Sequence, residues 1–288
     1  MDEPGDDGTR GDDGARLREV IKSGSELTGA AIGGAVGLMG GPPGAIGGAM
    51  AGVTITKVLT RVGLEVHDRL IVRRQQERVG RALGVMEHDA AQGLAAGHRP
   101  RDDGFFETPP DGRRSDAEEV LEGVLRAAAD ANQERKLRHL GAVFPSLAVR
   151  DDVDTSDAHW LVHTAEQVSW RQMVVLALLA DPPVDDLKTQ GLEEAEGRGR
   201  PCASVTLAEE VEELGRLGLV GTSRSDGKLV RAGATIGSIG QFWAVPMVDW
   251  KLTAAGALLV DVTRLCEING HERETVLRLL LDQGASSG

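Results

Sequence analysis

Hydrophobic side chains recur every three or four residues along most of the chain, which is the period of an amphipathic α-helix. The pattern runs from residue 57 to residue 96, and we expect one long helix there. Two short strands are predicted at 228–231 and 241–248. The expected fold class is mainly α with a minor β component. The other predicted helices cover residues 15–25, 115–131, 132–148, 156–180, 206–217, 254–267 and 272–281.

Local signals mark the ends of several of these helices. Ser115 followed by Glu118, and Thr206 followed by Glu209, have the spacing of capping boxes. Gly218 follows the last periodic residue of its helix and predicts a stop there.

A glycine-rich apolar run interrupts this charged chain, because no charged residue lies between Glu26 and Lys57. Spacing of four places its glycines on one stripe of a helix, where another backbone can approach closely. Pro42-Pro43 breaks a helix in the middle of the run. The run therefore predicts a helical hairpin whose packing residues are Gly29, Gly33, Gly37, Gly40, Gly44, Gly48 and Gly52.

Several environments suit this hairpin. Each arm would be about 20 Å long at ~1.5 Å per residue, whereas the hydrocarbon core of a bilayer is ~30 Å thick. A tilted hairpin, a re-entrant insertion and one kinked span are the membrane alternatives. The soluble alternative is an antiparallel hairpin packed within a bundle or an oligomer. The predicted partners are a membrane or further copies of the chain.

Charge is distributed unevenly. The net charge is −13, and an acidic protein is repelled by nucleic acid unless a local patch overrides the repulsion. A basic cluster follows the apolar run, and arginines beside an apolar segment suit anionic headgroups. We expect anionic-surface contact through Arg69, Arg73, Arg74, Arg78 and Arg81. The alternatives are a solvated helix face and pairing with the acidic remainder of the chain.

Composition divides the chain into five parts. Residues 97–114 contain Pro, Gly and charges without periodicity, which is typical of a linker. The expected parts are a disordered acidic tail (1–14), the hairpin with its basic helix (15–98), a linker (99–114), a helical and winged-helix-like domain (115–282) and a flexible tail (283–288). The acidic N-terminus lacks a signal-peptide profile. We expect a cytoplasmic protein, peripheral or inserted at the inner membrane face.

No catalytic constellation is predicted. Cys202 and Cys266 are far apart and form no metal or redox motif. The chain contains no GxGxxG or GxxxxGK[ST] pattern. His159 and His163 have the spacing of two metal ligands on one helix face but lack an identified third ligand. We therefore expect no enzyme activity, no cofactor and no metal.

Residues 170–266 resemble the winged helix of MarR- and PadR-like regulators. The resemblance is carried by WRQMVVLALLA, LAEEVEELGRLGLV, a glycine-rich stretch and WKLTAAGALLV. It implies a winged-helix-like C-terminal domain whose second helix would contact DNA. That helix instead carries Glu209, Glu210, Glu212 and Glu213, and acidic side chains do not suit the DNA groove. Residues 29–52 resemble the glycine zippers of bacterial envelope and stress proteins.

These patterns favour a non-enzymatic bacterial protein that associates with membrane or with itself. Its acidic C-terminal domain would contact an unknown protein partner, and a role in stress or defence would fit such a protein. Nucleic acid is not the expected partner. The alternative is a cytoplasmic regulator that binds DNA through the basic stretch 69–81 or through a wing carrying Arg224, Lys228 and Arg231.

Overall fold

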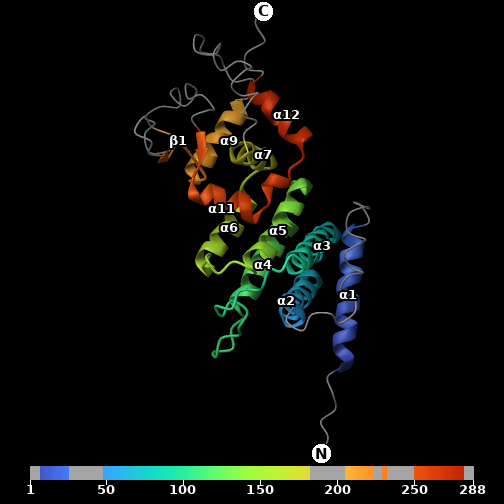
Figure 1. Cartoon of the computed structure of the whole chain (residues 1–288). Coiled ribbons are helices and arrows are strands. Elements are labelled where there is room, and N and C mark those ends of the chain that lie inside the picture. Colours follow the sequence, from blue (N-terminus) through green and yellow to red (C-terminus); the bar gives the residue numbers. More distant parts are fainter. Residues whose placement is uncertain (1–6, 26–47, 182–204, 224–228, 232–249, 282–288) are drawn as a thin grey trace, which may run out of the picture. The chain divides into compact units, whose positions relative to one another are not determined.

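The computed structural model describes residues 7–25, 48–181, 205–223, 229–231 and 250–281 of the chain (Figure 1). The described helices and strands form two compact units, Met1–Gln167 and Val168–Gly288. The protein is mainly helical, as the periodicity predicts.

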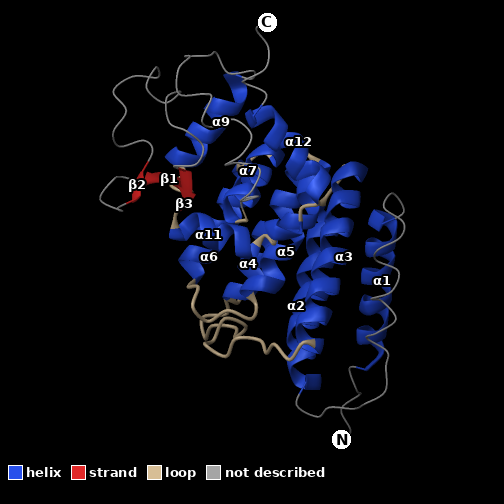
Figure 2. Ribbon diagram, turned by 45° about the horizontal axis from the view of Figure 1, so that its top comes forward, coloured by secondary structure: helices blue, strands red, loops and turns tan. Residues whose placement is uncertain are grey.

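The first unit consists of helices arranged around one central helix, α3. The long helices are drawn in Figure 2, where α1, α2 and α3 lie side by side, and α3 also packs against α4 and α5. The helices are α1 (Asp7–Ser25), α2 (Gly48–Arg69), α3 (Arg73–Ala95), α4 (Asp116–Asp130), α5 (Leu137–Leu147), preceded by a 3₁₀ turn at Glu134–Lys136, and α6 (Thr155–Gln167).

Close helix contact in this unit depends on a glycine. A Cβ atom at Gly141 of α5 would lie 2.8 Å from Cβ of Val85 on α3. The missing side chain therefore allows α5 to approach α3. Leu83 and Met86 of α3 and Leu140 of α5 are fully buried in the resulting core.

The helix expected over residues 57–96 is wrong in one respect, because a turn at Leu70, Ile71 and Val72 divides it into α2 and α3. The apolar stripe of α2 ends at Leu70. The positions that would continue that stripe, three and four residues later, are Arg73 and Arg74. The apolar stripe is therefore interrupted at this point, and a new helix, α3, begins at Arg73.

A second break falls in the helix expected over residues 156–180, which the structure divides into α6 and α7. Ser169 accepts a hydrogen bond from the backbone N–H of Gln172, and the Gln172 side chain accepts one from the backbone of Ser169. This capping box starts a new helix. The predicted box at Ser115 and Glu118 is confirmed at the start of α4.

The division between the two units falls after Gln167 and not within residues 99–114. Those residues had been expected to form a linker, but part of the segment is packed. Phe105 is buried, and the guanidinium of Arg101 lies over its ring, 4.5 Å from the centroid. Arg101 also donates a 2.7 Å hydrogen bond to the carbonyl of Val153. These contacts attach the segment to the first unit.

The N-terminal tail also differs from the expectation of disorder, because α1 begins at Asp7. Its C-terminal half supplies the anchoring residues Leu17, Val20 and Ile21, which are buried. Burial of this apolar stripe against α2 and α3 accounts for the ordered helix.

The second unit combines helices with a small antiparallel sheet. Strand β1 is central, in the order β2-β1-β3, with Gly221 opposite Arg231 on one side and opposite Lys251 on the other. The elements are α7 (Trp170–Ala180), α9 (Val205–Arg216), β1 (Val220–Ser223), β2 (Leu229–Arg231), β3 (Trp250–Leu252), α11 (Ala254–Val262), a 3₁₀ turn at Leu265–Glu267 and α12 (Gly270–Leu281).

The sequence Leu-Thr-x-x-Gly at 252–256 joins β3 to α11 through two specific contacts. Thr253 accepts a hydrogen bond from the backbone N–H of Gly256 and donates one to the carbonyl of Gly218. A Cβ atom at Gly256 would lie 2.0 Å from the carbonyl oxygen of Leu219. The predicted stop at Gly218 is confirmed, with a φ of 75°.

Several predictions lie outside the described residues. They include the hairpin with Gly29, Gly33, Gly37, Gly40 and Gly44, the strand at 241–248 and the tail at 283–288. Gly48 and Gly52 lie in α2, but the surroundings of the α2 N-terminal end are not described. Within the described ranges, every helix is too short or too polar to cross a bilayer.

Candidate functional site

The five arginines expected to contact an anionic surface lie around the turn between α2 and α3, and the structure separates them into two groups. Arg78 and Arg81 face the protein. Arg69, Arg73 and Arg74 lie at the turn itself and are exposed.

The two inward-facing arginines are held by groups of the first unit. Arg78 donates a hydrogen bond of 3.1 Å to the carbonyl of Ala129, at the end of α4. Arg81 is 11% exposed and lies 2.7 Å from the carboxylate of Glu134. The hydrogen bond from Arg81 lowers the pKa of Glu134. These two arginines join α3 to the end of α4 and to the 3₁₀ turn.

The outward-facing arginines form ion pairs that are more exposed to solvent. The Arg73 side chain is 91% exposed and lies 3.0 Å from Glu77, one helical turn along α3. The Arg74 side chain is 67% exposed and lies 3.5 Å from Glu134. Arg69 pairs with Glu65 on its own helix and also lies 3.6 Å from Glu122 of α4. The pairs of Arg73 and Arg74 are exposed, and exposed pairs contribute little to stability, about 0–1 kcal/mol, so these two guanidinium groups are available to other anions.

Two apolar side chains complete the turn. Ile71 is 96% exposed and Val72 is 54% exposed. They are two of only three large apolar residues that are exposed in the described part of the chain. We call the five residues Arg69, Ile71, Val72, Arg73 and Arg74 the turn surface. Its arginines were predicted from the sequence and its apolar pair was not, although three consecutive apolar residues, Leu70 to Val72, lie between Arg69 and Arg73.

The segment that carries the turn surface is positive in an acidic chain. Residues 69–81 contain five arginines and one glutamate, and five minus one gives +4, whereas the whole chain carries −13. A local patch of opposite sign orients a protein toward an anionic surface. The alternative in which the arginines pair with the acidic part of the chain holds for two of them, because Glu134 contacts Arg74 and Arg81.

The histidine pair of α6 has no metal-site geometry. One ring nitrogen of His163 lies 2.7 Å from the side-chain nitrogen of Gln167, and His159 is exposed. Across the residues whose side chains are described, no three His, Cys, Asp or Glu side chains form a group that could hold a metal ion.

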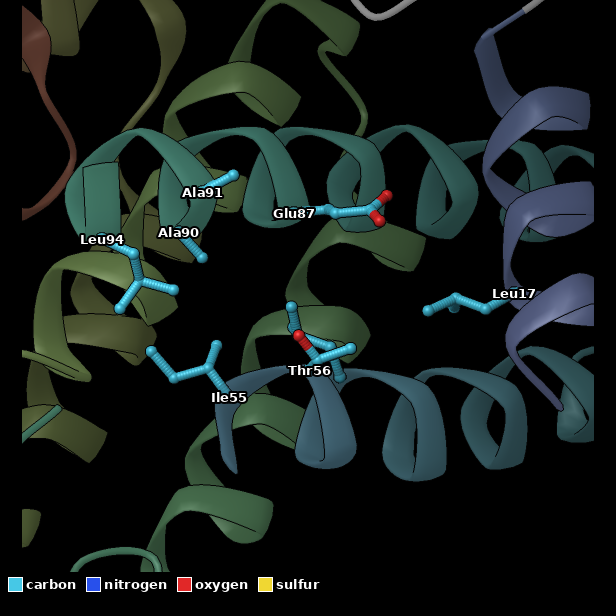
Figure 3. A pocket seen from close by; sticks show the side chains of 8 residues that line it. Leu17, Ile55, Thr56, Glu87, Ala90, Ala91 and Leu94 are labelled. Carbon is cyan, nitrogen blue, oxygen red and sulfur yellow. The ribbon is translucent and has the colours of Figure 1, made fainter. Parts of the chain in front are cut away.

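A small cavity lies among α1, α2 and α3 (Figure 3). Its volume is about 20 Å³, which is room for about one water molecule. Glu87 of α3 lines it and extends toward the side of α1, where Leu17 lies (Figure 3). Burial raises the pKa of Glu87, and the charge of Arg18 opposes that effect. The cavity is too small to hold a substrate-sized ligand.

Comparisons with protein-family models, with curated proteins and with solved structures found no match to this chain.

Proposed function

We propose that the chain is a non-enzymatic protein that attaches peripherally to an anionic membrane through the turn surface and contacts a protein partner through its second unit. The observation that carries this proposal is the exposure of Arg73 and Arg74 on a positive segment of an acidic chain. The remaining negative charge is repelled by the same membrane, so the turn is the part that faces it.

The electrostatic contribution has a definite size. An arginine near an anionic membrane surface contributes about 1 kcal/mol, and this attraction falls off within a Debye length. Arg73 and Arg74 together supply about 2 kcal/mol, which is roughly thirtyfold in affinity. Binding through these two residues should therefore be sensitive to salt.

For the second unit we propose a winged-helix-like module. The order of two helices, a strand pair, a third strand and a helix supports this assignment. On α9, Arg216 lies 2.5 Å from Glu213, and Glu210 lies 2.5 Å from Arg171 of α7. An acidic helix whose described arginine is paired suits a basic protein surface better than DNA. Self-association through the glycine-rich run stays a prediction, because most of that run lies outside the described residues.

Vesicle binding tests the membrane part of the proposal. The full chain should sediment with phosphatidylserine-containing vesicles and not with phosphatidylcholine vesicles. The double variant Arg73→Gln/Arg74→Gln should bind about thirtyfold more weakly. Arg113→Gln/Arg278→Gln is the matched control, because both side chains are 70% exposed and both pair with nearby carboxylates.

The control should bind like the parent protein. Equal losses in the two double variants would mean that net charge, and not the turn surface, governs binding. A parent protein that binds duplex DNA with higher affinity than anionic vesicles at the same salt would favour the regulator alternative.

A further inference from the structure

The apolar pair of the turn surface occupies positions that folding alone does not favour. Ile71 is almost fully exposed and gains nothing from burial. Val72 is the N-cap residue of α3 and makes no capping hydrogen bond with its side chain. Ser, Thr, Asp and Asn are strongly preferred at an N-cap, whereas Val is among the poorest choices. Local departures of this kind concentrate at functional sites.

The two apolar side chains, with Leu70 before them, lie between arginines in sequence. Arg69 precedes them by two residues and Arg73 follows at once. An arginine can lay its methylene stem along apolar surface while its guanidinium stays with phosphate groups. A turn with apolar residues at its tip and arginines at both sides therefore matches the layered chemistry of a bilayer edge, with hydrocarbon below the anionic headgroups.

We propose that Ile71 and Val72 insert into the boundary between the headgroups and the acyl chains, and so anchor the turn surface in the bilayer. This inference rests on the proposed membrane attachment and adds a second, hydrophobic component to it. The arginines bring the turn to the anionic surface, and the apolar pair retains it there.

Other partners fit this pair less well. A stable protein interface buries at least about 1,200 Å² in total, far more than two aliphatic side chains at a turn provide. The backbone of a nucleic acid offers phosphates to the arginines but gives exposed Ile71 no apolar region to enter. A lipid bilayer provides both environments at one contact.

Salt dependence separates the two components. Attraction between arginines and headgroups weakens as salt rises, whereas burial of apolar surface does not. The full chain should therefore keep a measurable part of its binding to phosphatidylserine vesicles at raised salt. The variant Ile71→Ser/Val72→Ser should lose that part, with a fall of about thirtyfold in partitioning. The matched control Ile71→Leu/Val72→Leu keeps apolar side chains and should bind like the parent.

A single substitution distinguishes this role from a structural one. Val72→Ser places a preferred N-cap residue at the start of α3, so it should raise the midpoint of thermal unfolding by ~2–4 °C. The same substitution should weaken vesicle binding. A residue with only a structural role would not gain stability and lose binding together.

The outcomes separate this inference from the proposed function. If Ile71→Ser/Val72→Ser binds like the parent while Arg73→Gln/Arg74→Gln binds weakly, the insertion is wrong and the electrostatic attachment stands. If neither double variant changes binding, both are wrong. If the serine variant lowers binding to duplex DNA as much as binding to vesicles, the insertion is wrong.

Discussion

Lys136 allows a quantitative test of the cost of a buried charge in the first unit. Lys136 is 3% exposed, and its ammonium group donates a 2.6 Å hydrogen bond to the carbonyl of Glu166 in the last turn of α6. Burial lowers the pKa of Lys136 from 10.5 to about 8. The charged form is therefore less favourable in the folded chain than in the unfolded chain.

The size of this cost follows from the two pKa values. One pKa unit corresponds to ~1.4 kcal/mol, so a decrease from 10.5 to about 8 means that burying the charge costs about 3 kcal/mol. The Lys136→Met variant removes this cost and keeps most of the side-chain volume. It also loses a hydrogen bond and leaves the Glu166 carbonyl without that donor, a penalty of ~1–3 kcal/mol. We expect the variant to be as stable as the parent at pH 7, or about 1 kcal/mol more stable.

The pH dependence of the parent has a definite sign. Between about pH 8 and pH 10.5 the unfolded chain holds a proton on Lys136 that the folded chain has released. Stability must therefore rise with pH in this window. Urea denaturation at pH 7 and pH 9.5, followed by circular dichroism, should show any advantage of Lys136→Met shrinking at the higher pH. A methionine variant at least ~2 kcal/mol less stable than the parent at both pH values would refute the reasoning.

Two further substitutions test contacts elsewhere in the chain. Gly256→Ala should destabilise the second unit by several kcal/mol, because its Cβ would lie 2.0 Å from the carbonyl oxygen of Leu219. Gly270→Ala is the control, since a Cβ there meets nothing within 4 Å, and equal thermal shifts for the two variants would contradict this account. Glu87→Gln should stabilise the chain at pH 7, because burial raises the pKa of this carboxyl. A raised pKa means that stability falls as pH rises from 4.5 through the folded pKa, so the gain over the parent should vanish near pH 4. Thermal unfolding at both pH values checks this, and a gain of equal size at both would rule out titration of Glu87.

Helix content and local caps could be predicted from sequence because both depend on short-range patterns. The capping box at Ser115 and the stop at Gly218 each involve residues within a few positions of each other, and the structure confirms both. The break at residues 70–72 was also present in the pattern. Both positions that would continue the apolar stripe are arginines, which had been interpreted only as a basic face.

Long-range contacts could not be predicted in the same way. The hydrogen bond from Arg101 to the carbonyl of Val153 and the burial of Phe105 cannot be predicted from the residues next to them in sequence. For this reason a segment with the composition of a linker was not expected to be packed. The division of the five arginines has the same origin. Arg81 and Arg73 lie on the same helix, but only Arg81 is on the face that contacts Glu134, a residue more than fifty positions away in sequence. The exposure of Ile71 likewise depends on where the tertiary fold places the turn.

The capping box after Gln167 lies at the junction between the two units and determines where α7 begins. Ser169 and Gln172 complete the first turn of α7 with their own side chains. Gln172 and Arg171 then bond to Glu210 of α9. The backbone N–H groups of Ser169 and Gln172 at this helix start therefore have partners within the second unit. A junction placed before Val168 keeps both residues of this capping box, so we expect α7 to begin at the same residue whatever segment precedes it.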